Sequence, residues 1–210
     1  MTIWYIARGS GLAALLLLSI STAIGALMSG QHSTRSGAAN RVVVSYLHRV
    51  TASLGLGVLV MHLAMILADS YAHVGWQGAI VPFTSGYRPT WVGLGTLAVY
   101  TFVLVAAVGA ARGRIATSAR GATVWRWLHS CAYLGWGMAM LHGLESGTDT
   151  PVGWVRWLYV ACAVLVVGAL TFRLTRLGLH REWRESLRVA GNVPPLGAEP
   201  ATRERAGAHR

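Results

Sequence analysis

Apolar runs of about 20 residues, the length a helix needs to cross a membrane, alternate with short polar stretches along this chain. The pattern predicts an all-α integral membrane protein, with a bundle of five transmembrane helices within residues 1–175. The first run is long for a signal peptide, so we interpret it as a retained span. The five predicted helices cover residues 4–28, 42–68, 91–111, 124–144 and 154–174.

The arginines set the predicted orientation of this bundle. Only 12% of the residues are charged, which argues against an ordinary soluble domain, and the net charge of +11 is carried by arginine without any lysine. Most arginines lie in the first and third polar connections and in the tail, residues 176–210. Because cytoplasmic loops are rich in basic residues, we predict an outside N-terminus and a basic, partly disordered cytoplasmic tail. This places the chain in a cell (inner or plasma) membrane, with lipid and not nucleic acid as its surroundings.

Two pairs of histidines interrupt the apolar runs. His48 and His62 lie fourteen residues apart in the second predicted helix, and His129 and His142 lie thirteen apart in the fourth. Ionisable side chains are costly in lipid and are usually functional there. At a rise of about 1.5 Å per residue, the members of each pair are separated by roughly 20 Å along the membrane normal. Since both helices run outward, we predict that His48 faces His129 and that His62 faces His142.

Each facing pair suits a haem iron, which takes axial ligands such as histidine. We therefore predict two stacked b-type haems, with all four histidines as iron ligands. The two pairs differ in how well they share one face of an ideal helix. A spacing of fourteen brings His62 to within about 40° of His48 around the helix axis, whereas a spacing of thirteen leaves His142 about 140° from His129. Glycines midway along both helices are expected to allow bending or close approach: Gly55, Gly57, Gly135 and Gly137.

Four arginines lie at the predicted cytoplasmic helix ends: Arg41, Arg49, Arg112 and Arg126. Arg49 and Arg126 are the nearest in sequence to the histidines. They could pair with the propionates of the inner haem, or they could serve only to anchor the helix ends on the positive side of the membrane. The sequence leaves both interpretations open.

The histidine pairs on alternate helices resemble those of the ferric reductase-like transmembrane family. That family includes ferric reductases, NADPH oxidases and the haem-binding membrane subunit of the periplasmic methionine sulfoxide reductase system. The unequal spacing, the run from Val81 to Tyr100, WRWLH from Trp125 and LHGLESGTD from Leu141 are similar to small bacterial members. The resemblance covers residues 1–175 and implies a haem-b protein for electron transport in the bacterial inner membrane. It also implies that His48, His62, His129 and His142 are the axial ligands.

The family's eukaryotic members have a sixth helix and a cytosolic FAD/NADPH module, for which this chain shows no nucleotide-binding pattern. The resemblance therefore implies the membrane component of an oxidoreductase that needs a partner. Electrons would come from a flavoprotein or quinol and pass to an extracytoplasmic acceptor, such as ferric iron or a partner flavin or reductase protein. Two alternatives stay open. One is a non-redox transporter or assembly subunit with histidines in a proton path, and the other is a single-haem subunit of a sulfoxide reductase system.

Overall fold

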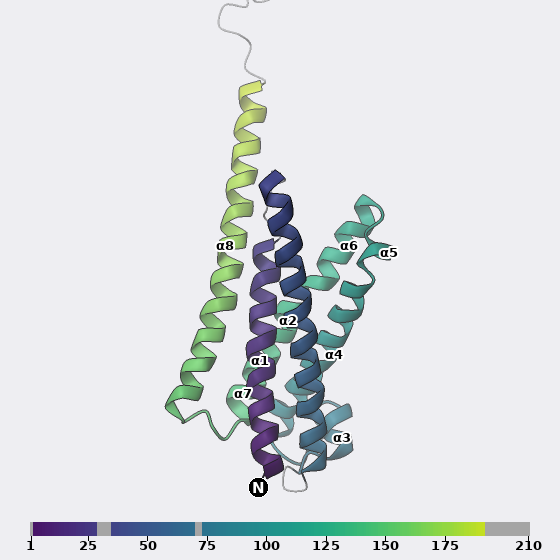
Figure 1. Ribbon diagram of the computed structural model, residues 1–210, viewed down its shortest axis with the longest axis vertical. Helices are drawn as coiled ribbons and strands as arrows, with labels where there is room; N and C mark the ends of the chain where they lie inside the picture. The colour runs from purple at the N-terminus through teal and green to yellow at the C-terminus, as the bar shows by residue number, and fades with distance from the viewer. Residues whose placement is uncertain (1, 29–34, 70–72, 192–210) are drawn as a thin grey trace, which may run out of the picture. The chain divides into compact units, whose positions relative to one another are not determined.

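The computed structural model describes residues 2–28, 35–69 and 73–191, and the side chains within 2–28, 40–69 and 73–179. All regular structure in these ranges is helical (Figure 1). The chain divides into two units, Met1–Arg173 and Leu174–Arg210. The helices are α1 (Thr2–Met28), α2 (Arg35–Ala68), α3 (Gly75–Ile80), α4 (Pro89–Ala110), α5 (Arg112–Ile115), α6 (Ala119–Ser130), α7 (Ala132–Ser146) and α8 (Gly153–Gly191). The predicted disorder of the tail beyond Gly191 lies outside the described residues.

Four of these helices are long and apolar enough to cross a membrane: Thr2–Met28, Asn40–Ala68, Pro89–Ala110 and Gly153–Leu179. They correspond to the first, second, third and fifth predicted helices, so the prediction of an all-α chain with membrane-type helices is confirmed. Pro89 occupies the start of α4, where a missing N–H costs nothing. Arg88, just before it, has a positive φ of 40° that turns the chain into the helix.

The fourth predicted helix is interrupted at Cys131. Its residues form α6, with 12 residues, and α7, with 15 residues. The Cys131 N–H donates to the Leu128 carbonyl at 3.2 Å, three residues back, which is a tighter turn than the α-helical step of four. The prediction of one continuous helix over 124–144 is therefore corrected. The irregular turn lies at Cys131 and not at Gly135 or Gly137.

The helices of the first unit pack as two hairpins, α1 along α2 and α4 along α7 (Figure 1). Contacts at one end join the start of α1, the α2–α4 connection and the α7–α8 connection. Arg8 forms an ion pair with Asp149, and the Tyr87 hydroxyl donates to the Ser146 carbonyl at 3.2 Å. Successive helices α1, α2, α4 and α7 therefore alternate in direction, and α2 and α7 both run toward this end.

The middle of the bundle is a packed apolar layer. Leu18, Ala98 and Phe102 are buried together, where α1 and α4 meet. Two of the four predicted glycines serve this layer, since a Cβ on Gly55 would meet Leu18 and one on Gly135 would meet Thr101, both at 3.0 Å. The other two, Gly57 and Gly137, have no such neighbour within 4 Å.

Candidate cofactor-binding site

His48 on α2 and His129 on α6 lie side by side at one level of the bundle. Their ring centroids are 6.1 Å apart and their planes make an angle of 74°. Two imidazoles that bind one metal ion from opposite sides, with metal–nitrogen distances of about 2 Å, have centroids roughly 6 Å apart. The separation of the rings therefore suits one shared metal ion. The Trp125 indole stacks on His129 with the ring centroids 5.1 Å apart, and the Arg112 guanidinium lies 5.0 Å from the indole centroid.

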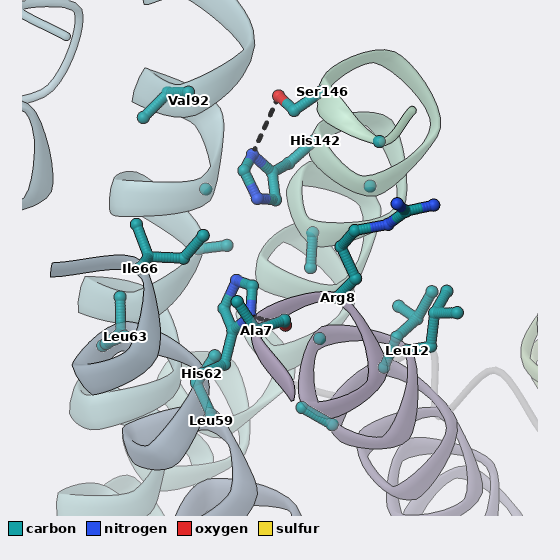
Figure 2. A pocket seen from close by; sticks show the side chains of 18 of the residues that line it. Ala7, Arg8, Leu12, Leu59, His62, Leu63, Ile66, Val92, His142 and Ser146 are labelled. Atoms are coloured by element: carbon teal, nitrogen blue, oxygen red, sulfur yellow. Dashed lines mark hydrogen bonds between the residues drawn. The ribbon is translucent and has the colours of Figure 1, made fainter. Parts of the chain in front are cut away.

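His62 on α2 and His142 on α7 line a single cavity at the other level (Figure 2). Figure 2 shows the two rings facing each other across it. The cavity has a volume of about 220 Å³ as space for the centres of water-sized molecules. One water needs about 10–15 Å³ by that measure, so the cavity is far larger than a packing defect. Its lining is mostly apolar, with side chains such as Leu15, Leu59 and Phe102.

Main-chain carbonyls of neighbouring helices fix three of the four rings. Each ring has its Nδ1 at hydrogen-bonding distance from a carbonyl oxygen: His48 from Ser21 (2.9 Å), His62 from Ala7 (2.7 Å) and His142 from Trp91 (2.8 Å). A carbonyl only accepts, so Nδ1 carries the proton and Nε2 of the neutral ring keeps its lone pair. Metal-binding histidines usually make such a bond through the nitrogen that does not bind the metal. In each of the three rings Nε2 is therefore the nitrogen that would be available to a metal ion.

His129 is held differently. The Val105 carbonyl lies close to its ring. The contact does not have the geometry of a hydrogen bond, and Nδ1 is buried without a hydrogen-bond partner among the described residues. The stacking of Trp125 on the ring takes over the orienting role, and the Trp125 indole N–H is itself fixed by the Val108 carbonyl at 3.0 Å. The two levels of the site therefore differ in how their histidine rings are held.

A glycine follows each of these four carbonyls by four residues and lies against the same ring. The pairs of carbonyl residue and glycine are Ala7 and Gly11, Ser21 and Gly25, Trp91 and Gly95, and Val105 and Gly109. A Cβ placed on the glycine would stand 3.0 Å from His62 at Gly11, 3.2 Å from His48 at Gly25, 2.7 Å from His142 at Gly95 and 3.2 Å from His129 at Gly109. Sequence reasoning missed these glycines. Their signal was the fourteen-residue spacing in α1 and α4, the same as that of His48 and His62.

The two hairpins thus repeat one arrangement. The glycines of α4 follow those of α1 by 84 residues, and the histidines of the second hairpin follow those of the first by 81 and 80. Each half supplies one glycine-bearing helix, α1 or α4, and one histidine to each level, from α2 in the first half and from α6 and α7 in the second. The histidine site therefore lies between two similar halves, as ligand sites do in membrane proteins built from repeated units.

The predicted arginines are less closely tied to the site. Arg49 and Arg126 are exposed, next to and three residues before the histidines of the first level. Arg126 donates to the Thr123 hydroxyl at 2.9 Å, and the Arg112 guanidinium lies over the Trp125 ring that stacks on His129. Their role as propionate partners therefore stays a prediction.

The sequence also gave no indication that Arg8 belongs to the second level. Arg8 lines the cavity beside His62 (Figure 2). Its guanidinium lies over the Trp4 ring and pairs with Asp149. Its Nε is buried and has no hydrogen-bond partner among the described residues. A positive side chain with an unused donor thus lies at the cavity.

The fold and the site together define an all-helical protein with membrane-type helices and histidine pairs at two levels. No group of three or more His, Cys, Asp or Glu side chains that could hold a metal ion occurs in the part of the chain that the structure describes. Comparison of the chain with protein-family models, with curated proteins and with solved structures finds no match.

Proposed function

We propose that this protein carries single electrons across a cell membrane through two b-type haems, one at each histidine level. His48 and His129 would hold the haem nearer the cytoplasm, and His62 and His142 the haem nearer the outside. A haem with two histidine ligands supplies reversible one-electron chemistry when bound. The observation that carries the proposal is the pairing of imidazoles at two levels, with three rings oriented for Nε2 ligation by a carbonyl at Nδ1.

The side chains around the pairs fit this role. Two histidines on one haem would favour electron transfer over the binding of oxygen or another substrate. The carbonyl bonds make the rings more basic ligands and hold their orientation. The apolar lining of the second level excludes water, while Arg8, and at the other level Arg49, Arg112 and Arg126, supply positive charge that suits carboxylate groups of the cofactor.

The proposal includes five crossings with the N-terminus outside. In it α6 and α7 together make the fourth crossing, since neither reaches the length of about 20 residues that a span needs. We expect an alkaline phosphatase fused after Thr150 to be active, and one fused after Thr117 or after Gly191 to be inactive. Green fluorescent protein at the same positions should give the opposite pattern. Active phosphatase after Thr117 would contradict the orientation.

Electrons must enter and leave through partners in this proposal. On the cytoplasmic side the donor is a separate flavoprotein or a quinol in the membrane. On the outer side the acceptor is ferric iron or a partner flavin or reductase protein, which would reach the His62–His142 level through the connections around Tyr87 and Asp149. Reduction of the haems by a purified membrane flavoprotein or by quinol would identify the donor.

The spectrum and the haem content of the purified protein test the proposal. Protein from haem-replete cells should show a b-type α band, and about two haems should be extracted per chain without covalent attachment. A folded but colourless preparation would favour a non-redox transporter or assembly subunit. One haem per chain would favour a single-haem subunit of a sulfoxide reductase system.

A further inference from the structure

We infer that Gly11, Gly25, Gly95 and Gly109 are positioning residues of the histidine site. Each glycine leaves room for a ring edge. Gly11, Gly25 and Gly95 also leave open the carbonyl four residues earlier, to which the Nδ1–H of the ring is directed. The inference depends on the proposed function only for the identity of the bound group. The placement of the rings is a property of the chain itself.

The reason lies in the direction of side chains on a helix. The Cα–Cβ bond tilts toward the helix N-terminus, so a side chain covers the surface of the turn before its own Cα. The carbonyl four residues earlier lies in that turn. A glycine therefore exposes this carbonyl to a donor from a neighbouring helix, as Gly11 does for the bond between Ala7 and His62.

The contacts distinguish these glycines from those that only let helices approach. The nearest atoms to an added Cβ at Gly11, Gly25, Gly95 and Gly109 are all atoms of a histidine ring. At Gly55 and Gly135 they belong instead to Leu and to Thr and Phe side chains of the packed layer. The histidine contacts recur at all four rings, including His129, whose Nδ1 lacks the hydrogen bond. The space for the ring edge is thus common to both levels.

The effect of an added methyl group on the placement of the histidine ring should differ among the four glycines. At Gly95 the Cβ would stand 2.7 Å from Nδ1 of His142, closer than real Cβ contacts, and that nitrogen is already bonded to the Trp91 carbonyl. The ring cannot turn aside without losing that bond. At Gly25 the distance of 3.2 Å lets a small shift of the His48 ring relieve the contact. The expected order of effect is Gly95→Ala, then Gly11→Ala, then Gly25→Ala and Gly109→Ala.

The test uses the full-length protein in lipid bilayers, with and without haem. Gly9→Ala and Gly168→Ala are the controls, because an added Cβ there has no neighbour within 4 Å. In protein without haem and labelled with ¹⁵N-histidine, we expect Nδ1-protonated tautomers for His48, His62 and His142, assigned by single His→Gln variants. Gly95→Ala should change the His142 signal alone. In haem-loaded protein it should weaken haem binding at that level about 10–100-fold and shift its electron paramagnetic resonance signal, as loss of an outer partner of a metal ligand does.

The outcomes separate this inference from the proposed function. If the protein binds haem and Gly95→Ala leaves the haem affinity, the resonance signals and the His142 tautomer unchanged, the inference is overturned and the proposed function stands. If the unaltered protein takes up no haem, the proposed function fails, while the tautomer of His142 in Gly95→Ala still decides the role of the glycine. Equal effects of Gly9→Ala and Gly11→Ala would also overturn it, because that result would reflect helix α1 and not the His62 ring.

Discussion

Replacing His62 by alanine should lower the haem content from about two per chain to about one, with the His48–His129 haem retained. The substitution would remove one of the two histidines proposed to hold that haem and would leave His142 as the other histidine lining the cavity. The two levels lie roughly 20 Å apart along α2, and sites that far apart with no shared partners respond independently. Haem extraction and the low-temperature α band measure the loss, and His142→Ala should remove the same spectral component.

The complementary variants complete this test. His48→Ala and His129→Ala should remove the other component and leave the His62–His142 haem in place. His73→Asn is a suitable control, because His73 is exposed in the α2–α4 connection and asparagine tolerates its positive φ of 50°. Unchanged haem content in all four alanine variants would refute the assignment of these histidines as ligands.

The sequence was sufficient to predict those helices that are marked by a long run of apolar residues. Long apolar runs predict α1, α2, α4 and α8 because burial in lipid requires every backbone group to be bonded within the helix. The histidines stood out for the same reason, since ionisable groups are rare in such runs. The structure then brings His48 beside His129 and places His62 and His142 in one cavity. The pairs could be foreseen because residues at equal depth on two parallel helices come within reach of each other.

Features that depend on contacts between helices could not be foreseen from one helix at a time. The glycines Gly11, Gly25, Gly95 and Gly109 look like ordinary small residues until the opposite ring is known. Gly57 and Gly137 were also predicted to allow close approach, but a Cβ added at either would have no neighbour within 4 Å. Arg8 precedes the first apolar run, and its place beside His62 depends on how α1 packs against α2.

The break at Cys131 explains how two histidines thirteen residues apart serve one face. On a continuous ideal helix, His129 and His142 would point about 140° apart. The structure instead places both rings against α4, at Gly109 and Gly95, which are fourteen residues apart on a regular helix. The tight turn at Cys131 separates α6 from α7 and lets each present its histidine to α4. The spacing therefore predicted a misalignment of His129 and His142 that the structure does not have, because the rotation of 100° per residue applies only within an unbroken helix.

A helix broken at Cys131 and a continuous ideal helix should respond in opposite ways to a one-residue insertion. Inserting one alanine after Trp136 restores a spacing of fourteen, which would improve the alignment of His129 and His142 on a continuous helix. With the break at Cys131, the insertion instead rotates His142 by about 100° away from Gly95 and the Trp91 carbonyl. We therefore expect loss of the His62–His142 haem, with the other haem retained, measured as haem per chain and by the α band. An alanine inserted after Thr117, in the α5–α6 connection, leaves the spacing unchanged and should keep both haems. Retention of two haems after the insertion at Trp136 would show that the turn at Cys131 does not set the face on which His142 lies.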